Sequence, residues 1–66
     1  MKPERIKAKL ILAGKTQRQI ARELNVTESA VSLTISGRSR SARIEQAVAQ
    51  AIGKPREEVF NHRRAA

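Results

Sequence analysis

The sequence predicts an all-α protein with four helices and a short fifth one, on three observations. Four successive segments carry apolar residues at the three- and four-residue spacing of helices, and no stretch alternates cleanly enough to predict a strand. Glycine or asparagine follows each of these segments, where helices commonly end. The 66 residues suffice for one domain, and the apolar residues include ten alanines and one aromatic side chain, so we expect one small aliphatic core.

The first helix is expected at residues 3–13. Pro3 suits the first turn of a helix, because its missing N–H would have no partner there. The apolar residues that follow lie four and three positions apart, on one face. They are Ile6, Leu10 and Ala13, with Ile11 beside them. Gly14 offers the left-handed conformation that ends many helices.

The second helix is expected at residues 17–24 and the third at 28–36. Thr16 and Gln19 form the sequence pattern of a capping box, and Thr27 can cap the third helix by accepting from the N–H of Ser29 or Ala30. The apolar faces consist of Ile20, Ala21 and Leu24 in the second helix, and of Ala30, Val31, Thr34 and Ile35 in the third. Only three residues separate the two helices, and Asn25 tolerates the left-handed conformation that so tight a turn requires.

A polar loop at 36–41 leads to the fourth helix, expected at 42–52 with Ser41 as its cap. Its predicted buried face consists of Ile44, Ala47, Val48, Ala51 and Ile52. Pro55 opens a fifth helical turn at 55–59, and Val59 and Phe60 are expected to close the core. The domain is expected to span 1–61, followed by a basic disordered tail at 62–66.

The charge of the chain is strongly unbalanced. Lys and Arg total 14 against 6 Glu and no Asp, which gives a net charge of +8. A polyanion is the expected partner, although the basic residues could also serve only to keep a small domain soluble. The chain lacks cysteine and any apolar run long enough for a membrane span or a signal peptide, so we expect a soluble cytoplasmic protein with no membrane partner.

Two short helices joined by a tight turn are the helix-turn-helix, whose second helix enters the DNA major groove. The run from Gln17 to Ser36 resembles the motif of lambdoid phage repressors and Cro proteins, with Ala21, Asn25 and Val31 in register. That family most often has Gly at the position of Asn25. Asn is the next best residue at positive φ, so the turn is expected to form.

The segment after this motif also resembles the family, and the resemblance covers residues 5–61. The matching features are the pair Ile52-Gly53 and the closing run Pro55-Arg56-Glu57-Glu58-Val59-Phe60. Lys54 stands where the family usually has Ser, so the fifth helix lacks its side-chain cap. The small size and basic loop are most similar to the phage Ner-like branch. The resemblance implies a compact lambda-repressor-like DNA-binding domain of four to five helices, and a repressor of phage or prophage type.

Base contacts are expected from the outward side of the third helix, which holds Thr27, Glu28, Ser29, Ser32 and Leu33. Glu28 is suited to cytosine N4 and is repelled by phosphate, and Leu33 could pack on a thymine methyl group. Two alternatives stay open: Glu28 could simply favour the helix N-terminus, and Leu33 could cover the edge of the core.

Phosphate contacts must come from elsewhere, because the third helix contains no Lys or Arg. The N-terminus of the second helix and the loop before the fourth helix supply donors and positive charge. The expected phosphate-binding residues are Lys15, Thr16, Gln17, Arg18, Arg38, Ser39, Arg40 and Arg43. Lys7 and Lys9 are expected on a solvated face instead.

Catalytic or metal-binding equipment is not expected. His62 is the only histidine, and the six Glu suit ion pairs, as for Glu23 and Glu45. We therefore predict a transcriptional regulator that binds double-stranded DNA, without cofactor, metal or small-molecule ligand, and that represses by occluding an operator. We expect a homodimer at least on DNA, paired near Val59 and Phe60 or through the DNA itself.

Two alternatives remain beside this prediction. One is an antitoxin-like or accessory protein that regulates its own operon. The other is a basic helical module that binds a membrane surface or acidic proteins, although such a module would favour long apolar stripes with interfacial aromatic residues.

Overall fold

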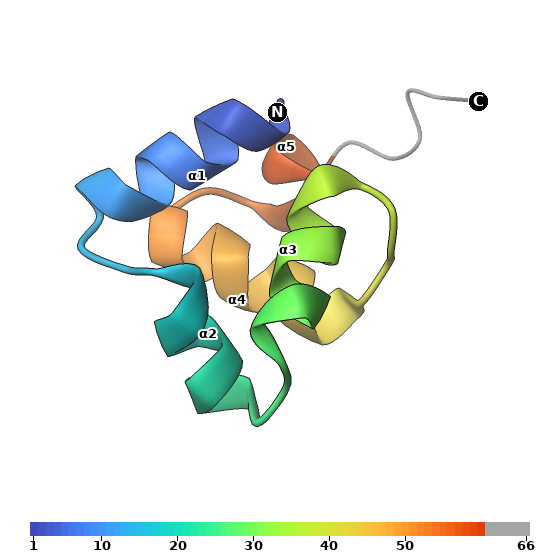
Figure 1. The fold of residues 1–66 in the computed structure, drawn as a ribbon. Helices are drawn as coiled ribbons and strands as arrows, with labels where there is room; N and C mark the ends of the chain where they lie inside the picture. The colour runs from blue at the N-terminus through green and yellow to red at the C-terminus, as the bar shows by residue number, and fades with distance from the viewer. Residues whose placement is uncertain (61–66) are drawn as a thin grey trace.

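The computed structural model describes residues 1–60, and this part of the chain is all-helical (Figure 1). The helices are α1 (Pro3–Leu12), α2 (Gln17–Leu24), α3 (Glu28–Ser36), α4 (Ala42–Ile52) and α5 (Arg56–Val59). The predicted bounds of α2, α3 and α4 are confirmed. The predicted tail at 62–66, with His62, lies outside the described residues.

The helix starts follow the capping signals of the sequence. At α2, the Gln19 N–H donates to Thr16 Oγ1 at 3.1 Å, and the Thr16 N–H donates to Gln19 Oε1 at 2.9 Å. At α3, the Ala30 N–H donates to Thr27 Oγ1 at 3.1 Å. The Ile44 N–H donates to Ser41 Oγ at 3.4 Å. Each bond satisfies a backbone N–H that the helix itself leaves without a partner, which fixes where the helix begins.

Asn25 makes the turn between α2 and α3. Its φ of 59° places it in the left-handed region, where it is the only residue other than glycine among the described residues. The Val26 N–H then donates to the Ala21 carbonyl at 2.9 Å, which closes the end of α2. The chain can therefore reverse direction within three residues.

Asn25→Ala is expected to lower the free energy of unfolding by about 1 kcal/mol, because a Cβ without a hydrogen-bonding side chain is disfavoured in the left-handed region. Asn25→Gly is the control and should leave stability unchanged or raise it slightly. Urea unfolding followed by circular dichroism measures both. Equal stability of the Ala and Gly variants would contradict the turn geometry.

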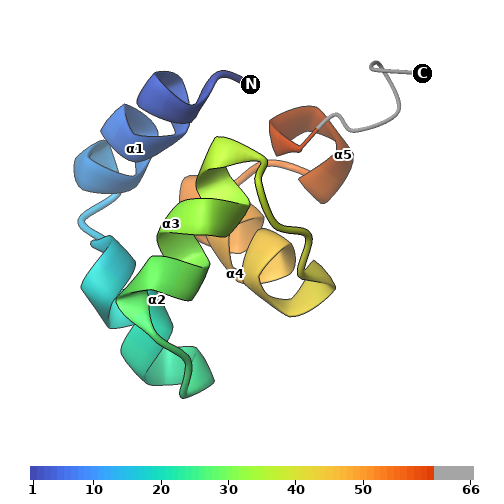
Figure 2. The ribbon, with the colours of Figure 1, turned by 45° about the vertical axis from the view of Figure 1, so that its right-hand side comes forward.

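The core lies around α4, which packs against each of the other four helices (Figure 2). The buried hydrophobic residues of this core lie in all five helices, with Phe60 directly after α5. They are Ile6, Leu10, Ile20, Ala21, Val31, Ile35, Ile44, Val48, Ala49, Val59 and Phe60. The prediction that Val59 and Phe60 close the core is confirmed.

The predicted core is wrong at the end of α1 and along α4. Ala13 is exposed, because α1 ends at Leu12 and the chain turns outward through Gly14. In α4 the buried strip is shifted: Glu45 and Ala49 are buried, whereas Ala47, Ala51 and Ile52 are only half-buried. The fifth helix also begins at Arg56 and not at Pro55, which occupies the N-cap position without a side-chain cap, as expected from Lys54.

Candidate nucleic-acid interface

The pair formed by α2 and α3 positions the predicted base-contacting residues. Ala21 of α2 is 5% exposed and Val31 of α3 is fully buried, so the inner faces of both helices lie in the core. Thr34 is buried as well, and its hydroxyl donates to the Ala30 carbonyl at 2.9 Å. The inner side of α3 is thereby fixed, and Glu28, Ser29 and Leu33 are exposed on the opposite side.

The predicted base-contacting residues on the outward side of α3 differ in their exposure to solvent. Thr27, Glu28 and Ser29 are exposed at the N-terminal end, whereas Ser32 is half-buried. Leu33 is 43% exposed, so neither of its two predicted roles is favoured by its burial alone. The Thr27 hydroxyl already accepts from the Ala30 N–H of its own helix, which leaves its O–H donor and one lone pair for another partner.

The predicted phosphate-binding residues at the start of α2 lie around one hollow of about 420 Å³. The hollow is lined by Lys7, Leu10, Ile11, Lys15, Thr16, Gln17, Arg18 and Glu28. Lys7 of α1 therefore lies beside the predicted phosphate-binding residues at the start of α2, although it was expected on a solvated face apart from them. Glu28, predicted as a base contact, lies at the same hollow.

Ion pairs engage two of these cations. Lys15 pairs with Glu23. Arg18 Nε donates to Glu28 Oε2 at 3.1 Å, which links the first turn of α2 to the first residue of α3. This second pair joins residues ten positions apart on different helices, so no pattern within one helix predicts it.

The second predicted group lies in and after the loop between α3 and α4. The N–H groups of Arg38 and Ser39 donate to the Leu33 carbonyl at 3.0 and 3.2 Å, so the loop is attached to the end of α3. Arg38 and Arg40 are exposed and form no ion pair within residues 1–60. Their guanidinium groups are therefore available to an anion.

Arg43 differs from the other predicted phosphate-binding residues. Its Nη2 donates to the Leu24 carbonyl at 3.0 Å, across nineteen positions of sequence. Leu24 is the last residue of α2, where backbone carbonyls lack helical partners and favour a cation. Arg43 thus fastens the start of α4 to the end of α2, and only its other donors remain for phosphate.

Two further ion pairs involve glutamates of α4 and α5. Glu45 is buried, at 5% exposed, and lies 3.9 Å from Arg56 Nε through its Oε1. Glu58 pairs with Lys54 at 3.1 Å. The prediction that Glu23 and Glu45 serve as ion-pair partners is confirmed.

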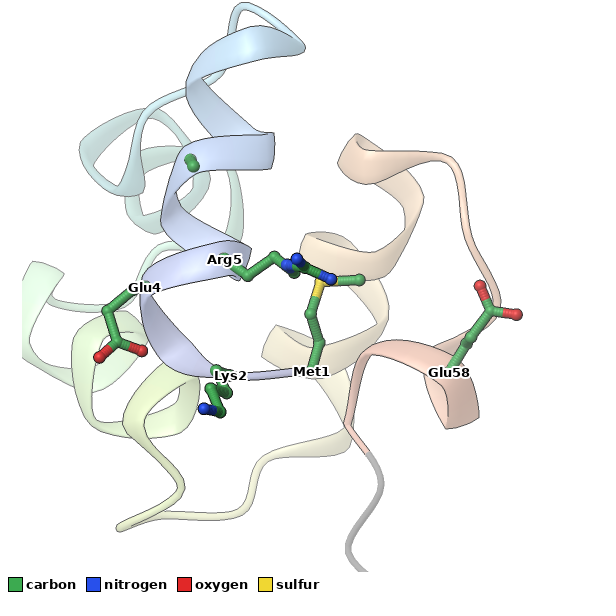
Figure 3. Close-up of a pocket in the computed structure, with 6 residues that line it drawn as sticks. Met1, Lys2, Glu4, Arg5 and Glu58 are labelled. Atoms are coloured by element: carbon green, nitrogen blue, oxygen red, sulfur yellow. The ribbon is translucent and has the colours of Figure 1, made fainter.

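A larger hollow, of about 790 Å³, lies between the start of α1 and α5 (Figure 3). It is lined by Met1, Lys2, Glu4, Arg5, Ala8 and Glu58. Figure 3 shows the Arg5 side chain extending toward Met1, while the Glu4 and Glu58 carboxylates lie on opposite sides. None of these residues belongs to the predicted interface, and their mixed charges do not favour an anion.

Within residues 1–60, no three His, Cys, Asp or Glu side chains lie close enough together to hold a metal ion. None of the helices in this part of the chain has the length and apolar character needed to cross a bilayer. No protein-family model, no curated protein and no solved structure matches the chain.

Proposed function

We propose that this protein is a sequence-specific DNA-binding regulator of transcription, in which α2 and α3 act as a helix-turn-helix. The observation that carries the proposal is the three-residue turn between α2 and α3. The α3 helix after this turn has exposed polar residues at its N-terminal end. An α-helix with its side chains is about 10–12 Å in diameter, which suits a major groove about 12 Å wide. Exposed hydroxyl groups at the N-terminal end of α3 suit the edges of bases.

Two basic groups on either side of α3 support the same proposal. Figures 1 and 2 show α3 between α2 and the loop that follows α3. The hollow at the start of α2 holds Lys7, Lys15 and Arg18, and the loop holds Arg38 and Arg40. The phosphate backbones lie on both sides of a groove, so cations placed in this way would fix the helix between them.

The proposed mode of action is repression by occlusion of an operator, as in the phage repressors that the sequence resembles. One helix of this length contacts only a few base pairs, so two copies per operator are proposed, with half-sites about 34 Å apart. The pairing surface near Val59 and Phe60 belongs to this proposal. Both side chains are largely buried within the monomer, which favours pairing through the DNA over a stable free dimer.

Selection of bound sequences from random duplex DNA tests the proposal and reveals the symmetry of the site. On the selected duplex, about 4–6 phosphate contacts should give a slope of log affinity against log salt of about −4 to −5 per monomer. Fluorescence anisotropy measures this slope. A slope near zero, or no enrichment of any sequence, would contradict the proposal.

A double variant tests the loop group. Arg38→Ala with Arg40→Ala should flatten the salt slope by about 2, because two phosphate contacts are removed. Lys54→Ala is the control, since Lys54 is paired with Glu58 and belongs to neither basic group. A flattened slope in the control variant as well would show that net charge alone governs binding.

A further inference from the structure

The ion pair between Arg18 and Glu28 joins the two halves of the proposed interface. Arg18 belongs to the predicted phosphate group and Glu28 to the predicted base-contacting group, and their side chains meet at 3.1 Å. Lys15 pairs with Glu23 and Lys54 with Glu58, but neither of these pairs includes a residue from the outward side of α3. The Arg18–Glu28 pair is therefore placed where reading a base and binding a phosphate affect each other.

We infer, on the basis of the proposed function, that Glu28 is a specificity-determining residue that controls the release of Arg18 to the DNA backbone. The Glu28 carboxylate accepts from the Arg18 Nε–H, a donor that a phosphate oxygen would also use. When the exocyclic amino group of a base donates to Glu28, the carboxylate has a new partner. Arg18 is then released to bind a phosphate at the start of α2.

On DNA sequences that offer Glu28 no amino donor, the change of partners is unfavourable in either of two ways. If the ion pair stays intact, Arg18 contributes less to phosphate binding. If Arg18 leaves, the Glu28 carboxylate remains without a partner beside the phosphates, and like charges repel. Glu28 thus weakens binding to every sequence that offers it no donor.

The exposure of the pair makes the exchange feasible. The side chains of Arg18 and Glu28 are 75% and 55% exposed, and ion pairs between solvated groups contribute little to stability. The fold does not depend on the pair, so it opens when both partners find others. A buried pair, by contrast, would resist opening, because each charge would be left without solvent or partner.

The chemistry of the preferred base follows from the carboxylate. Glu28 only accepts hydrogen bonds when ionised. In the major groove the exocyclic amino donors are cytosine N4 and adenine N6. Selection from random DNA distinguishes the two, and both lead to the same coupling with Arg18.

Glu28→Gln tests the inference, because it removes the charge and keeps the shape of the side chain. Affinity is measured by fluorescence anisotropy on the selected duplex and on a random duplex. We expect binding to the random duplex to tighten about three- to tenfold, with a salt slope steeper by about 1, while the selected duplex gains less. Repeated selection should show a relaxed preference at one base pair. An equal change on both duplexes, or no change on either, would overturn the inference.

Two further variants separate this effect from net charge. Glu23→Gln removes one negative charge from the ion pair with Lys15, away from α3, and should change binding to both duplexes by the same factor. In an Arg18→Gln background, Glu28→Gln should lose most of its selective effect on random DNA. If it keeps the full effect there, Glu28 acts without Arg18 and the inference is wrong.

The two proposals fail differently. If the unaltered protein prefers no sequence over random DNA, the proposed function is wrong. If it is selective but Glu28→Gln changes both duplexes equally, only the coupling is wrong. Thermal unfolding followed by circular dichroism verifies that each variant is folded at the assay temperature.

Discussion

Leu10→Ala is expected to lower the free energy of unfolding by about 2–5 kcal/mol. Leu10 is 1% exposed and belongs to the core that α1 shares with the other helices. The substitution removes buried methyl groups and leaves a cavity that a well-packed interior fills only in part. At roughly 0.05–0.15 kcal/mol per residue the total stability of the 66-residue chain is about 3–10 kcal/mol, so the variant should lose a large share of it.

Leu12→Ala is the matched control. Leu12 lies two residues further along the same helix and is 85% exposed, so the same chemical change should alter stability by no more than about 0.5 kcal/mol. Urea unfolding followed by circular dichroism compares the two variants. Equal losses would contradict the face of α1 that the structure buries.

Local sequence features, namely the helix caps and the turn residue Asn25, predicted the helix bounds well. The caps Thr16, Thr27 and Ser41 each bond to an N–H three positions later, and all three bonds are present. Asn25 adopts the positive φ that the tight turn requires. These signals depend on local backbone geometry alone, so the sequence contains what is needed to place the ends of α2, α3 and α4.

Burial was predicted less well, because it depends on what covers each face. In α4, Glu45 and Ala49 are buried although the apolar pattern marked other positions. This helix contacts all four others, so a wider part of its surface is covered than one stripe. Near the end of α1 the reverse holds, and Ile11 is 72% exposed although an apolar residue was expected beside the core face.

The sequence predicted which residues form the candidate interface, but not which hydrogen bonds and ion pairs these residues make with one another. The basic groups and the outward side of α3 follow from periodicity and charge. The bond from Arg43 to the Leu24 carbonyl and the pair between Arg18 and Glu28 join residues on different helices. Their partners depend on how the helices cross, which spacing along one helix does not determine. Contact of any of these residues with DNA stays a prediction.

Replacing the outward serines of α3 is expected to cause the second large effect, a loss of affinity for the selected duplex. Ser29→Ala and Ser32→Ala are each expected to weaken binding to the selected duplex by about 1–3 kcal/mol, because a lost bond to a base edge is specific to that base. Random DNA should be affected less. Arg40→Ala should weaken both duplexes alike, since phosphates carry no sequence information. Fluorescence anisotropy at one fixed salt concentration measures all three variants.

Ser36→Ala is the matched control for these serine variants. The Ser36 hydroxyl donates to the Leu33 carbonyl of its own helix at 3.0 Å, at the C-terminal end of α3. That end is further from the base edges when a recognition helix enters the groove with its N-terminal residues. The substitution should therefore leave binding to both duplexes unchanged. If Ser29→Ala and Ser32→Ala instead weaken both duplexes equally, or match Ser36→Ala, then α3 is not the helix that reads the bases.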